Sequence, residues 1–417
     1  MQLKRVVVTG IGAITPLGKT LDEYWEGLVN GVSGADFIKQ FDCSKFKTRF
    51  ACEVKDFEPT QYLDKKEARK IDRFTQFALI VSDQAMKDAG LNKESINADR
   101  AGVIFASGIG GLITFQEEVV GFAQGDGTPR FNPFFIPKMI LDIAAGQISM
   151  RHGLRGPNYA VVSACASSTN AIIDAFDNIR LGKADIILTG GSEAVISAAG
   201  VGGFNAMKAL SERNDDPKTA SRPFDKERDG FVMGEGAGML VLEELEHALA
   251  RGAKIYCEIA GGGATADAHH ITAPHPEGLG ALNVMKTALA DAGMQADEID
   301  YINVHGTSTP LGDIAETKAI LGVFGDHAYN LNISSTKSMT GHCLGAAGAL
   351  EAIAAIMSVV HDTVPPTINH FTDDPELDPK LNFTFNKAQK REVRAALSNT
   401  FGFGGHNASV IVKKFKR

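Results

Sequence analysis

The stretch Tyr159–Ser168, YAVVSACASS, decides the fold, because a short strand-like run meets a turn of small residues there and a helical pattern follows. Apolar residues recur at helical spacing over residues 171–179 and Gly182 follows as a C-cap, so we expect a helix that begins near Ser167. Cys165 lies at the join, where free backbone N–H groups favour a thiolate. We therefore interpret Cys165 as a nucleophile; the alternative is a buried cysteine that acts as a small apolar residue.

Composition sets the broad class. The chain has 417 residues, of which 44% are hydrophobic and 22% charged, so it can bury a large core and form two lobes. A net charge of -8 argues against a nucleic-acid partner. Five cysteines without a CxxC spacing indicate neither a disulfide framework nor a structural zinc site, which fits a reducing cytoplasm.

Targeting and membrane signals are not expected from this sequence. The first apolar run, residues 6–9, is too short for a signal peptide and is typical of a first strand. The longest apolar segment, residues 346–360, is interrupted by Glu351 and is interpreted as too short for a membrane span. We therefore expect a cytoplasmic protein without membrane insertion.

An internal repeat indicates the domain organisation. Three pairs of segments correspond in pattern, namely 85–105 with 288–304, 159–179 with 331–357, and 238–242 with 408–412. Each half alternates strands and helices, which predicts an α/β fold with two sheets and helices between and around them. The boundary falls near residues 251–254, giving an N-terminal half over 1–253 and a C-terminal half over 254–417.

Two histidines of the second half occupy places related to the Cys165 turn. His305 follows the strand that ends at Val304, and His342 lies in the turn that the repeat makes equivalent to that of Cys165. A single histidine at a strand end is most often a structural residue. Two of them and a helix-start cysteine, all on corresponding strand ends of duplicated halves, instead predict one shared site.

Two other motifs do not indicate a cofactor or metal. Residues 9–18, TGIGAITPLG, resemble a dinucleotide-binding loop, but Thr15 replaces the third glycine and Pro16 interrupts the helix start. The histidines of the Pro-rich loop 269–275 lack acidic partners, so we expect no metal site there.

Four motifs carry a family resemblance over essentially the full length: SACAS at 163–167, VHGTSTP at 304–310, KSMTGH at 337–342 and FGFGG at 401–405. The chain resembles the β-ketoacyl synthases, the condensing enzymes of type II fatty acid synthesis. Ile109 within SGIGG is similar to the synthase II form of the family, because the synthase I form usually has glycine there. His406 departs from the threonine that many members have after the paired glycines.

The resemblance implies a thiolase-like fold with layers α-β-α-β-α, a homodimer, and a decarboxylative condensation. Cys165 would take the acyl group from one acyl carrier protein, and the enolate formed from malonyl-carrier protein would attack it. His305 and His342, as neutral imidazoles, would donate to the malonyl thioester oxygen, with the helix start disfavouring protonation of His342. Backbone N–H groups of Cys165 and Phe403 would form the oxyanion hole. No separate cofactor is implied, because both substrates arrive on the phosphopantetheine arm of acyl carrier protein.

Further residues match supporting roles in the family. Lys337 and Glu351 resemble its buried charged pair, for which an ordinary structural salt bridge is the alternative. Thr307 and Thr309, with Thr272, resemble the hydroxyls that bind the pantetheine arm, although each could instead cap a local turn.

The acyl pocket and the docking surface complete the expected site. Phe403, flanked by glycines, resembles a gate for the acyl pocket, with a core aromatic as the alternative, and Ile109 would bound the pocket length. Lys66, Arg69 and Lys70 belong to a basic cluster that matches the family's docking residues for the carrier protein; a solvated helix face is the alternative.

Other classes of function remain open at this point. A thiolase would use a second catalytic cysteine, for which Cys343 is a candidate, and a Cys-His hydrolase would release the acyl group to water. A chain-length factor would lack the nucleophile, which Cys165 argues against. The sequence leaves open the preferred acyl chain and the choice between fatty acid synthesis and a related polyene or polyketide route.

Overall fold

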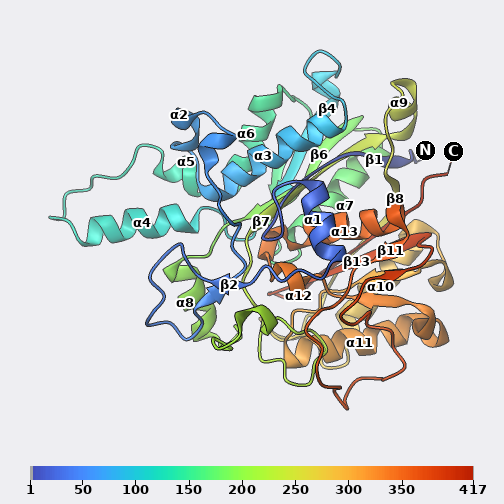
Figure 1. Cartoon of the computed structure of the whole chain (residues 1–417). Coiled ribbons are helices and arrows are strands. Elements are labelled where there is room, and N and C mark those ends of the chain that lie inside the picture. Colours follow the sequence, from blue (N-terminus) through green and yellow to red (C-terminus); the bar gives the residue numbers. More distant parts are fainter. Residues whose placement is uncertain (1–2, 417) are drawn as a thin grey trace.

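A ten-stranded sheet forms the frame of the computed structural model, which describes residues 3–416 (Figure 1). Its strands are β1 (Val6–Ile14), β4 (Ala101–Ala106), β5 (Asn158–Val161), β6 (Ile186–Glu193), β7 (Gly236–Glu244), β8 (Cys257–Ala266), β9 (Tyr301–Asn303), β10 (Asn332–Ser334), β13 (Ala395–Gly402) and β14 (His406–Lys413). Their spatial order is β10-β9-β13-β14-β8-β1-β7-β6-β4-β5.

The sheet consists of two halves with the same topology. The order β5-β4-β6-β7-β1 in one half corresponds to β10-β9-β13-β14-β8 in the other, with parallel pairing among the first three strands and antiparallel pairing thereafter. This equivalence confirms the predicted duplication. The expectation of two separate sheets is wrong, because residues 6–8 of β1 pair with residues 257–259 of β8 and join the halves edge to edge.

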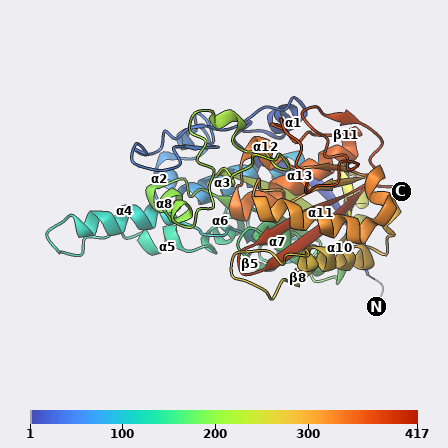
Figure 2. The ribbon, with the colours of Figure 1, turned by 90° about the horizontal axis from the view of Figure 1, so that it is seen from below.

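Helices form three layers around the sheet halves (Figures 1 and 2). The first half is covered on its outer face by α3 (Arg73–Asp88) and α6 (Ile143–His152), and the second by α10 (Leu279–Ala292) and α11 (Pro310–Phe324). Between the halves lie α7 (Ser167–Arg180) and α13 (Ala347–His361), whose apolar residues share one core with strands of both halves. The layers therefore follow the predicted order α-β-α-β-α.

Helix α13 is the central core helix. With the preceding turn it forms an apolar segment, Leu344–His361, that is long and apolar enough to cross a membrane by length and composition alone. The sequence analysis considered the shorter run of residues 346–360, which lies within this segment. Its surroundings explain the composition, because 89% of the segment is buried inside the protein.

Strand β1 is longer than the sequence pattern indicated, since the motif at residues 9–18 is strand as far as Ile14. The glycines serve close packing against α3. A Cβ atom at Gly10 would lie 2.3 Å from the carbonyl oxygen of Ala85, and one at Gly12 would lie 2.1 Å from that of Val81. Glycine here brings strand and helix backbones together and does not form a loop for a ligand.

The remaining elements surround this frame. Helix α1 spans Leu21–Val29, with Thr20 as its N-cap. The others are α2 (Lys65–Ala68), α4 (Leu112–Ala123), α5 (Phe135–Met139), α8 (Ala198–Ala206), α9 (Leu245–Ala250), α12 (Lys337–Thr340), β2 (Asp36–Phe37), β3 (Phe50–Ala51), β11 (Thr363–Val364) and β12 (Gln389–Lys390).

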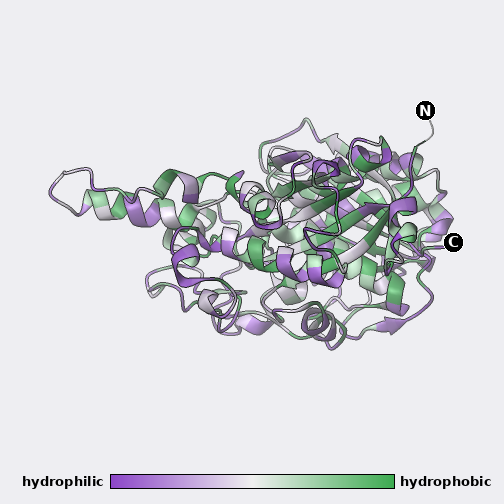
Figure 3. Cartoon of the chain, turned by 90° about the horizontal axis from the view of Figure 1, so that it is seen from above, coloured by the Kyte–Doolittle hydropathy of each residue, from purple (hydrophilic) through white to green (hydrophobic). Residues whose placement is uncertain are grey.

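Helices α4 and α5 form an arm that projects from the body and carries apolar as well as polar residues (Figure 3).

Candidate active site

Cys165 lies at the tip of a tight turn between β5 and α7. Ala164 adopts a left-handed conformation, with a φ of 51°, which a residue with a side chain seldom takes. Ser167 fixes the turn, because its hydroxyl donates to the carbonyl of Ala164 at 2.6 Å and accepts from the N–H of Ser163 at 2.8 Å. Helix α7 begins at Ser167, so Cys165 stands two residues before the helix, as the sequence predicted.

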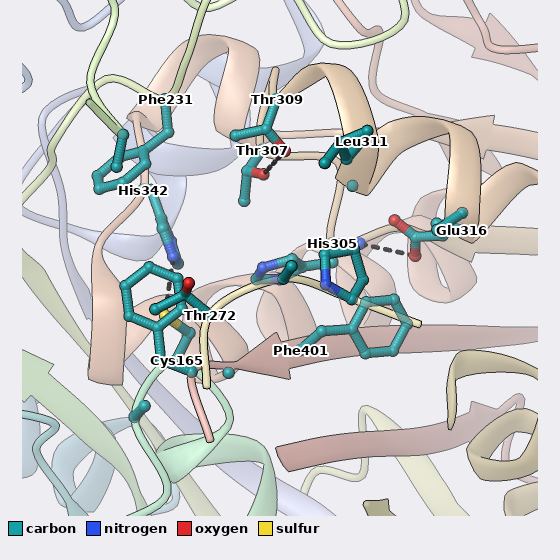
Figure 4. Close-up of a pocket in the computed structure, with 18 of the residues that line it drawn as sticks. Cys165, Phe231, Thr272, His305, Thr307, Thr309, Leu311, Glu316, His342 and Phe401 are labelled. Carbon is teal, nitrogen blue, oxygen red and sulfur yellow. Dashed lines mark hydrogen bonds between the residues drawn. The ribbon is translucent and has the colours of Figure 1, made fainter. Parts of the chain in front are cut away.

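The structure brings Cys165, His305 and His342 together (Figure 4). The Nε2 atom of His342 lies 3.1 Å from the Sγ atom of Cys165. The rings of His305 and His342 are 5.3 Å apart between centroids and nearly perpendicular. A cysteine of the first half thus faces two imidazoles of the second half.

A cavity of about 580 Å³ opens onto these three residues. Its lining includes every residue that the sequence assigned to substrate binding, namely Ile109, Thr272, Thr307, Thr309 and Phe403. The cavity has the size of a small-molecule site, and Cys165 is part of its wall.

Burial governs the ionisation of Cys165. It raises the pKa of this thiol to about 12, although the positive charge of Lys337 and the backbone N–H of Phe403 oppose the rise. Loss of hydration therefore works against the thiolate that the sequence analysis expected at this helix start. Cys165 rests as a thiol whose nearest base is the Nε2 atom of His342.

Both active-site histidines are neutral near pH 7. Burial lowers the pKa of His305 and of His342 well below the usual value, and the charge of Lys337 lowers both further. The prediction of neutral imidazoles agrees with this, but the cause is burial and Lys337 rather than the helix start. Phe231, which the sequence analysis did not single out, packs the edge of its ring against His342.

Glu316 of α11 is a buried group that the sequence analysis missed. Its carboxylate accepts from the backbone N–H groups of His305 and Gly306, each at 2.9 Å, and from the side-chain amide of Asn399 at 3.2 Å. Burial raises the pKa of Glu316 to about 7. Glu316 therefore holds the backbone that carries His305.

Lys337 and Glu351 form the charged pair that the sequence predicted. The ammonium of Lys337 donates to Oε1 of Glu351, and both side chains are almost fully buried. Burial raises the pKa of Glu351 to about 7, and Lys337 opposes the rise. The positive charge of Lys337 is close enough to lower the pKa of Cys165 and of both histidines. Neither Lys337 nor Glu351 lines the cavity.

The threonines lie on different walls of the cavity. The Oγ1 atoms of Thr307 and Thr309 are 3.1 Å apart, in a turn whose backbone carbonyl at Thr309 accepts from the buried guanidinium of Arg228. Thr272 belongs to an exposed loop. The structure thus places hydroxyls on two sides of the entrance to Cys165.

Phe403 lies in a glycine-rich turn between β13 and β14. Gly404 has a φ of 88°, a conformation that glycine adopts without strain, and its N–H donates to the carbonyl of Ile271 at 2.7 Å. The Phe403 ring lies 6.4 Å from that of Phe204 across the cavity. A second backbone hydrogen bond, from the N–H of Asp267 to the carbonyl of Gly405 at 2.9 Å, also ties the turn to the segment that carries Thr272.

The basic residues expected to dock a carrier protein lie outside the cavity. Lys66, Arg69 and Lys70 are exposed on α2 and the turn that follows it. The ammonium of Lys70 lies over the ring of Phe134 in the projecting arm, 5.4 Å from its centroid. Within residues 3–416 no group of three His, Cys, Asp or Glu side chains is arranged to hold a metal ion.

Comparisons with known proteins show which family the chain belongs to. Residues 3–248 match the N-terminal domain of β-ketoacyl synthases and residues 256–371 match the C-terminal domain. The chain is 51% identical over 416 residues to the 3-oxoacyl-[acyl-carrier-protein] synthase 2 of Synechocystis sp. (strain ATCC 27184 / PCC 6803 / Kazusa), covering 100% of this chain and 99% of that protein. It is 50% identical over 417 residues to the protein of the same name from Staphylococcus aureus (strain COL), with the same coverage.

Solved structures show the same fold. A ketosynthase of a type II polyketide synthase, bound to its acyl-carrier protein and a hexaketide, superposes with a TM-score of 0.92 at 33% identity, covering 99% of this chain and 100% of that one. A β-ketoacyl synthase from Burkholderia phymatum STM815 gives 0.91 at 37% identity with equal coverage. The predicted thiolase-like fold is thereby confirmed. Because both family domains match in order and the curated relatives align over the whole length, the chain belongs to the β-ketoacyl synthase family.

Proposed function

We propose that this chain catalyses the decarboxylative condensation of an acyl-acyl-carrier-protein with malonyl-acyl-carrier-protein to give 3-oxoacyl-acyl-carrier-protein, the elongation step of fatty acid synthesis. The observation that carries the proposal is the 3.1 Å approach of His342 Nε2 to Cys165 Sγ beneath the cavity, with His305 beside it. The names of the Synechocystis and Staphylococcus aureus relatives support the same reaction.

The first half-reaction is acyl transfer to Cys165. His342 accepts the thiol proton while sulfur attacks the acyl thioester, and the pantetheine sulfur leaves and takes that proton from His342, which returns to its neutral form. The backbone N–H groups of Cys165 and Phe403 stabilise the oxyanion as it forms. A buried thiol with a neutral imidazole in contact needs no resting thiolate for this step.

The second half-reaction is decarboxylation followed by carbon–carbon bond formation. His305 and His342 donate hydrogen bonds to the thioester oxygen of the malonyl group, CO2 leaves, and the bond electrons enter the enolate. The enolate carbon attacks the acyl-Cys165 carbonyl, and the cysteine sulfur leaves as the 3-oxoacyl product forms. Neutral imidazoles suit this role, because each can donate one N–H while carrying no charge in a buried site.

Substrate delivery uses the walls of the cavity. Thr307, Thr309 and Thr272 bind the phosphopantetheine arm, and the acyl chain extends past Phe403 and Ile109. The enzyme needs no cofactor of its own in this scheme, because sulfur and the prosthetic arm of the carrier protein supply the activated acyl groups.

We further propose a cytoplasmic homodimer. Its support is apolar surface that a single chain leaves exposed. The edge strand β5 exposes Tyr159 and is followed at once by the exposed Val162. The arm exposes further large apolar side chains, namely Phe115, Val119, Val120, Phe122, Phe131, Phe134 and Ile136. Patches of this kind mark protein interfaces.

The test is intact-mass analysis after incubation with a panel of acyl-carrier proteins, followed by addition of malonyl-carrier protein with a labelled carboxyl group. We expect an acyl adduct that maps to Cys165, release of labelled CO2 and formation of a 3-oxoacyl product. An adduct that decays to free acid without CO2 release would identify a hydrolase. Repeated condensation to a polyketide would assign the chain to that route instead.

A further inference from the structure

Glu193, the last residue of β6, is a buried carboxylate that the reaction scheme does not use. Its side chain is fully buried and accepts five hydrogen bonds. The donors are the hydroxyl of Ser107 at 2.9 Å and the backbone N–H groups of Gly108 at 2.8 Å, Ile109 at 3.2 Å, Gly110 at 3.4 Å and Gly345 at 2.9 Å. One carboxylate therefore joins a loop of the first half to a turn of the second.

Both joined segments are walls of the cavity. Ile109 lines it from the loop, and Leu344, the neighbour of Gly345, lines it from the turn that follows His342. The segments touch at backbone distance, because a Cβ atom at Gly345 would lie 2.2 Å from the amide nitrogen of Gly108. A Cβ atom at Gly108 would also lie 3.4 Å from the carbonyl oxygen of Ala164, next to Cys165.

We propose that Glu193 is a positioning residue for acyl-chain selection, which holds the loop of Ile109 and the turn of Leu344 at a fixed separation beside Cys165. The inference rests on the proposed function. Glu193 itself does not line the cavity and touches no substrate, so it acts through the two walls.

The chemistry of the five contacts requires an ionised carboxylate. Every partner of Glu193 is a donor, and hydrogen bonding to the charged form favours that form. These bonds oppose the rise in the pKa of Glu193 that burial causes. In Glu193→Gln, an NH2 group would replace one carboxylate oxygen. Because an NH2 group donates hydrogen bonds and does not accept them, the N–H groups facing it would have no acceptor.

Glu193→Gln is the direct test, read as the ratio of kcat/KM for acylation of Cys165 by long and by short acyl-carrier proteins. We expect the ratio to change by at least about tenfold, because displacement of a pocket wall by roughly a methylene changes discrimination on that scale. Ser107→Ala removes one donor and should change the ratio in the same direction by a smaller factor. If Glu193→Gln folds poorly, the ratio measured for Ser107→Ala still tests the proposal.

Two further variants separate positioning from loss of stability. Glu243→Gln alters another buried glutamate, which lies on β7 opposite Ile186, at the other end of the β6–β7 strand pair from Glu193. This variant should lower stability without changing the ratio. Ile109→Ala removes the side chain that Glu193 positions, so adding Glu193→Gln to it should have much less effect than in the wild type.

Equal loss of acylation at all chain lengths in the Glu193 and Ser107 variants, as in Glu243→Gln, would overturn the inference. An additive effect of the Ile109 and Glu193 changes would also overturn it. Failure of the proposed function would look different, since the wild type would then take no acyl group from any carrier protein or would convert the acyl-enzyme without forming a single 3-oxoacyl product, whatever its chain-length ratio.

Discussion

His342 Nε2 and Cys165 Sγ lie 3.1 Å apart although the two residues are separated by 177 positions and belong to different halves of the duplicated fold. The contact joins a base from one half to a nucleophile from the other. His305 and the Lys337–Glu351 pair come from the second half as well. In the proposed scheme acyl transfer uses Cys165 and His342, whereas decarboxylation uses His305 and His342, so variants of Cys165 and His305 should affect the two steps differently.

The two half-reactions should be separable by substitution. Cys165→Ala should abolish acylation and condensation but retain some decarboxylation, because both histidines remain. His305→Ala should lower CO2 release by about a hundredfold, the scale on which loss of one oxyanion donor acts, and should affect acylation less. Labelled CO2 from malonyl-carrier protein and the mass of the acyl-enzyme measure the two steps. Wild-type decarboxylation by His305→Ala, or ketoacyl product from Cys165→Ala, would contradict these roles.

Charge reversal at the basic cluster should weaken carrier-protein docking. Arg69→Glu should lower kcat/KM for acyl-carrier protein by about tenfold at low salt, because attraction to an acidic partner becomes repulsion. The loss should shrink as salt screens the charges, and a small acyl thioester should react normally. Lys286→Glu, on the exposed side of α10, is the matched control. Equal losses on both substrates would refute a docking role.

Side-chain size at Phe403 and Ile109 should alter acyl selection. Phe403→Ala should change which chains acylate Cys165, since a ring that separates the entrance from the pocket is removed. Ile109→Trp should shorten the longest chain accepted by filling the cavity that Ile109 lines. Acylation by a series of chain lengths, followed by intact mass, measures both. The assignment of this pocket fails if both profiles match the wild type.

Alkylation of Cys165 should report its raised pKa. Thiolate is the reactive form, and burial raises the pKa of the Cys165 thiol to about 12. The fraction of Cys165 present as thiolate therefore increases with pH throughout the neutral and mildly alkaline range. The rate with iodoacetamide should rise about tenfold per pH unit between roughly pH 7 and 9, without a plateau. His342→Ala should slow the reaction at neutral pH by removing the nearest base. Peptide mapping assigns the modified cysteine, and a plateau below about pH 8 would show a thiolate.

Much of the fold could be predicted from local patterns. Helix α7 begins at Ser167, where its periodicity placed it, and the repeat correctly paired elements of the two halves. The course of β1 could not be predicted, because Gly10 and Gly12 look like loop glycines until α3 is packed against them. The joining of the halves was missed for a related reason, since the pairing of β1 with β8 is a long-range contact without a local signal.

For the active site, the sequence motifs could be recognised, but the surroundings of each residue in the folded protein could not. The motifs identified the residues that converge on the cavity, but not the burial that keeps Cys165 protonated. Glu316 and Glu193 could not be recognised from the sequence because most of their partners are backbone N–H groups, which every residue type except proline carries. The sequence did contain one signal for Glu193. This charged residue ends a buried strand, and a buried carboxylate needs hydrogen-bond donors around it.

The equivalence of the turns that carry Cys165 and His342 has a consequence for the origin of this chemistry. Two identical halves related by a twofold axis would present the same residue at both turns, either two thiols or two imidazoles. A nucleophile facing a base requires the turns to differ. Fusion into one polypeptide allows this, because each copy can then mutate independently. The proposed reaction therefore depends on a chemical difference between two turns that the duplicated topology makes equivalent.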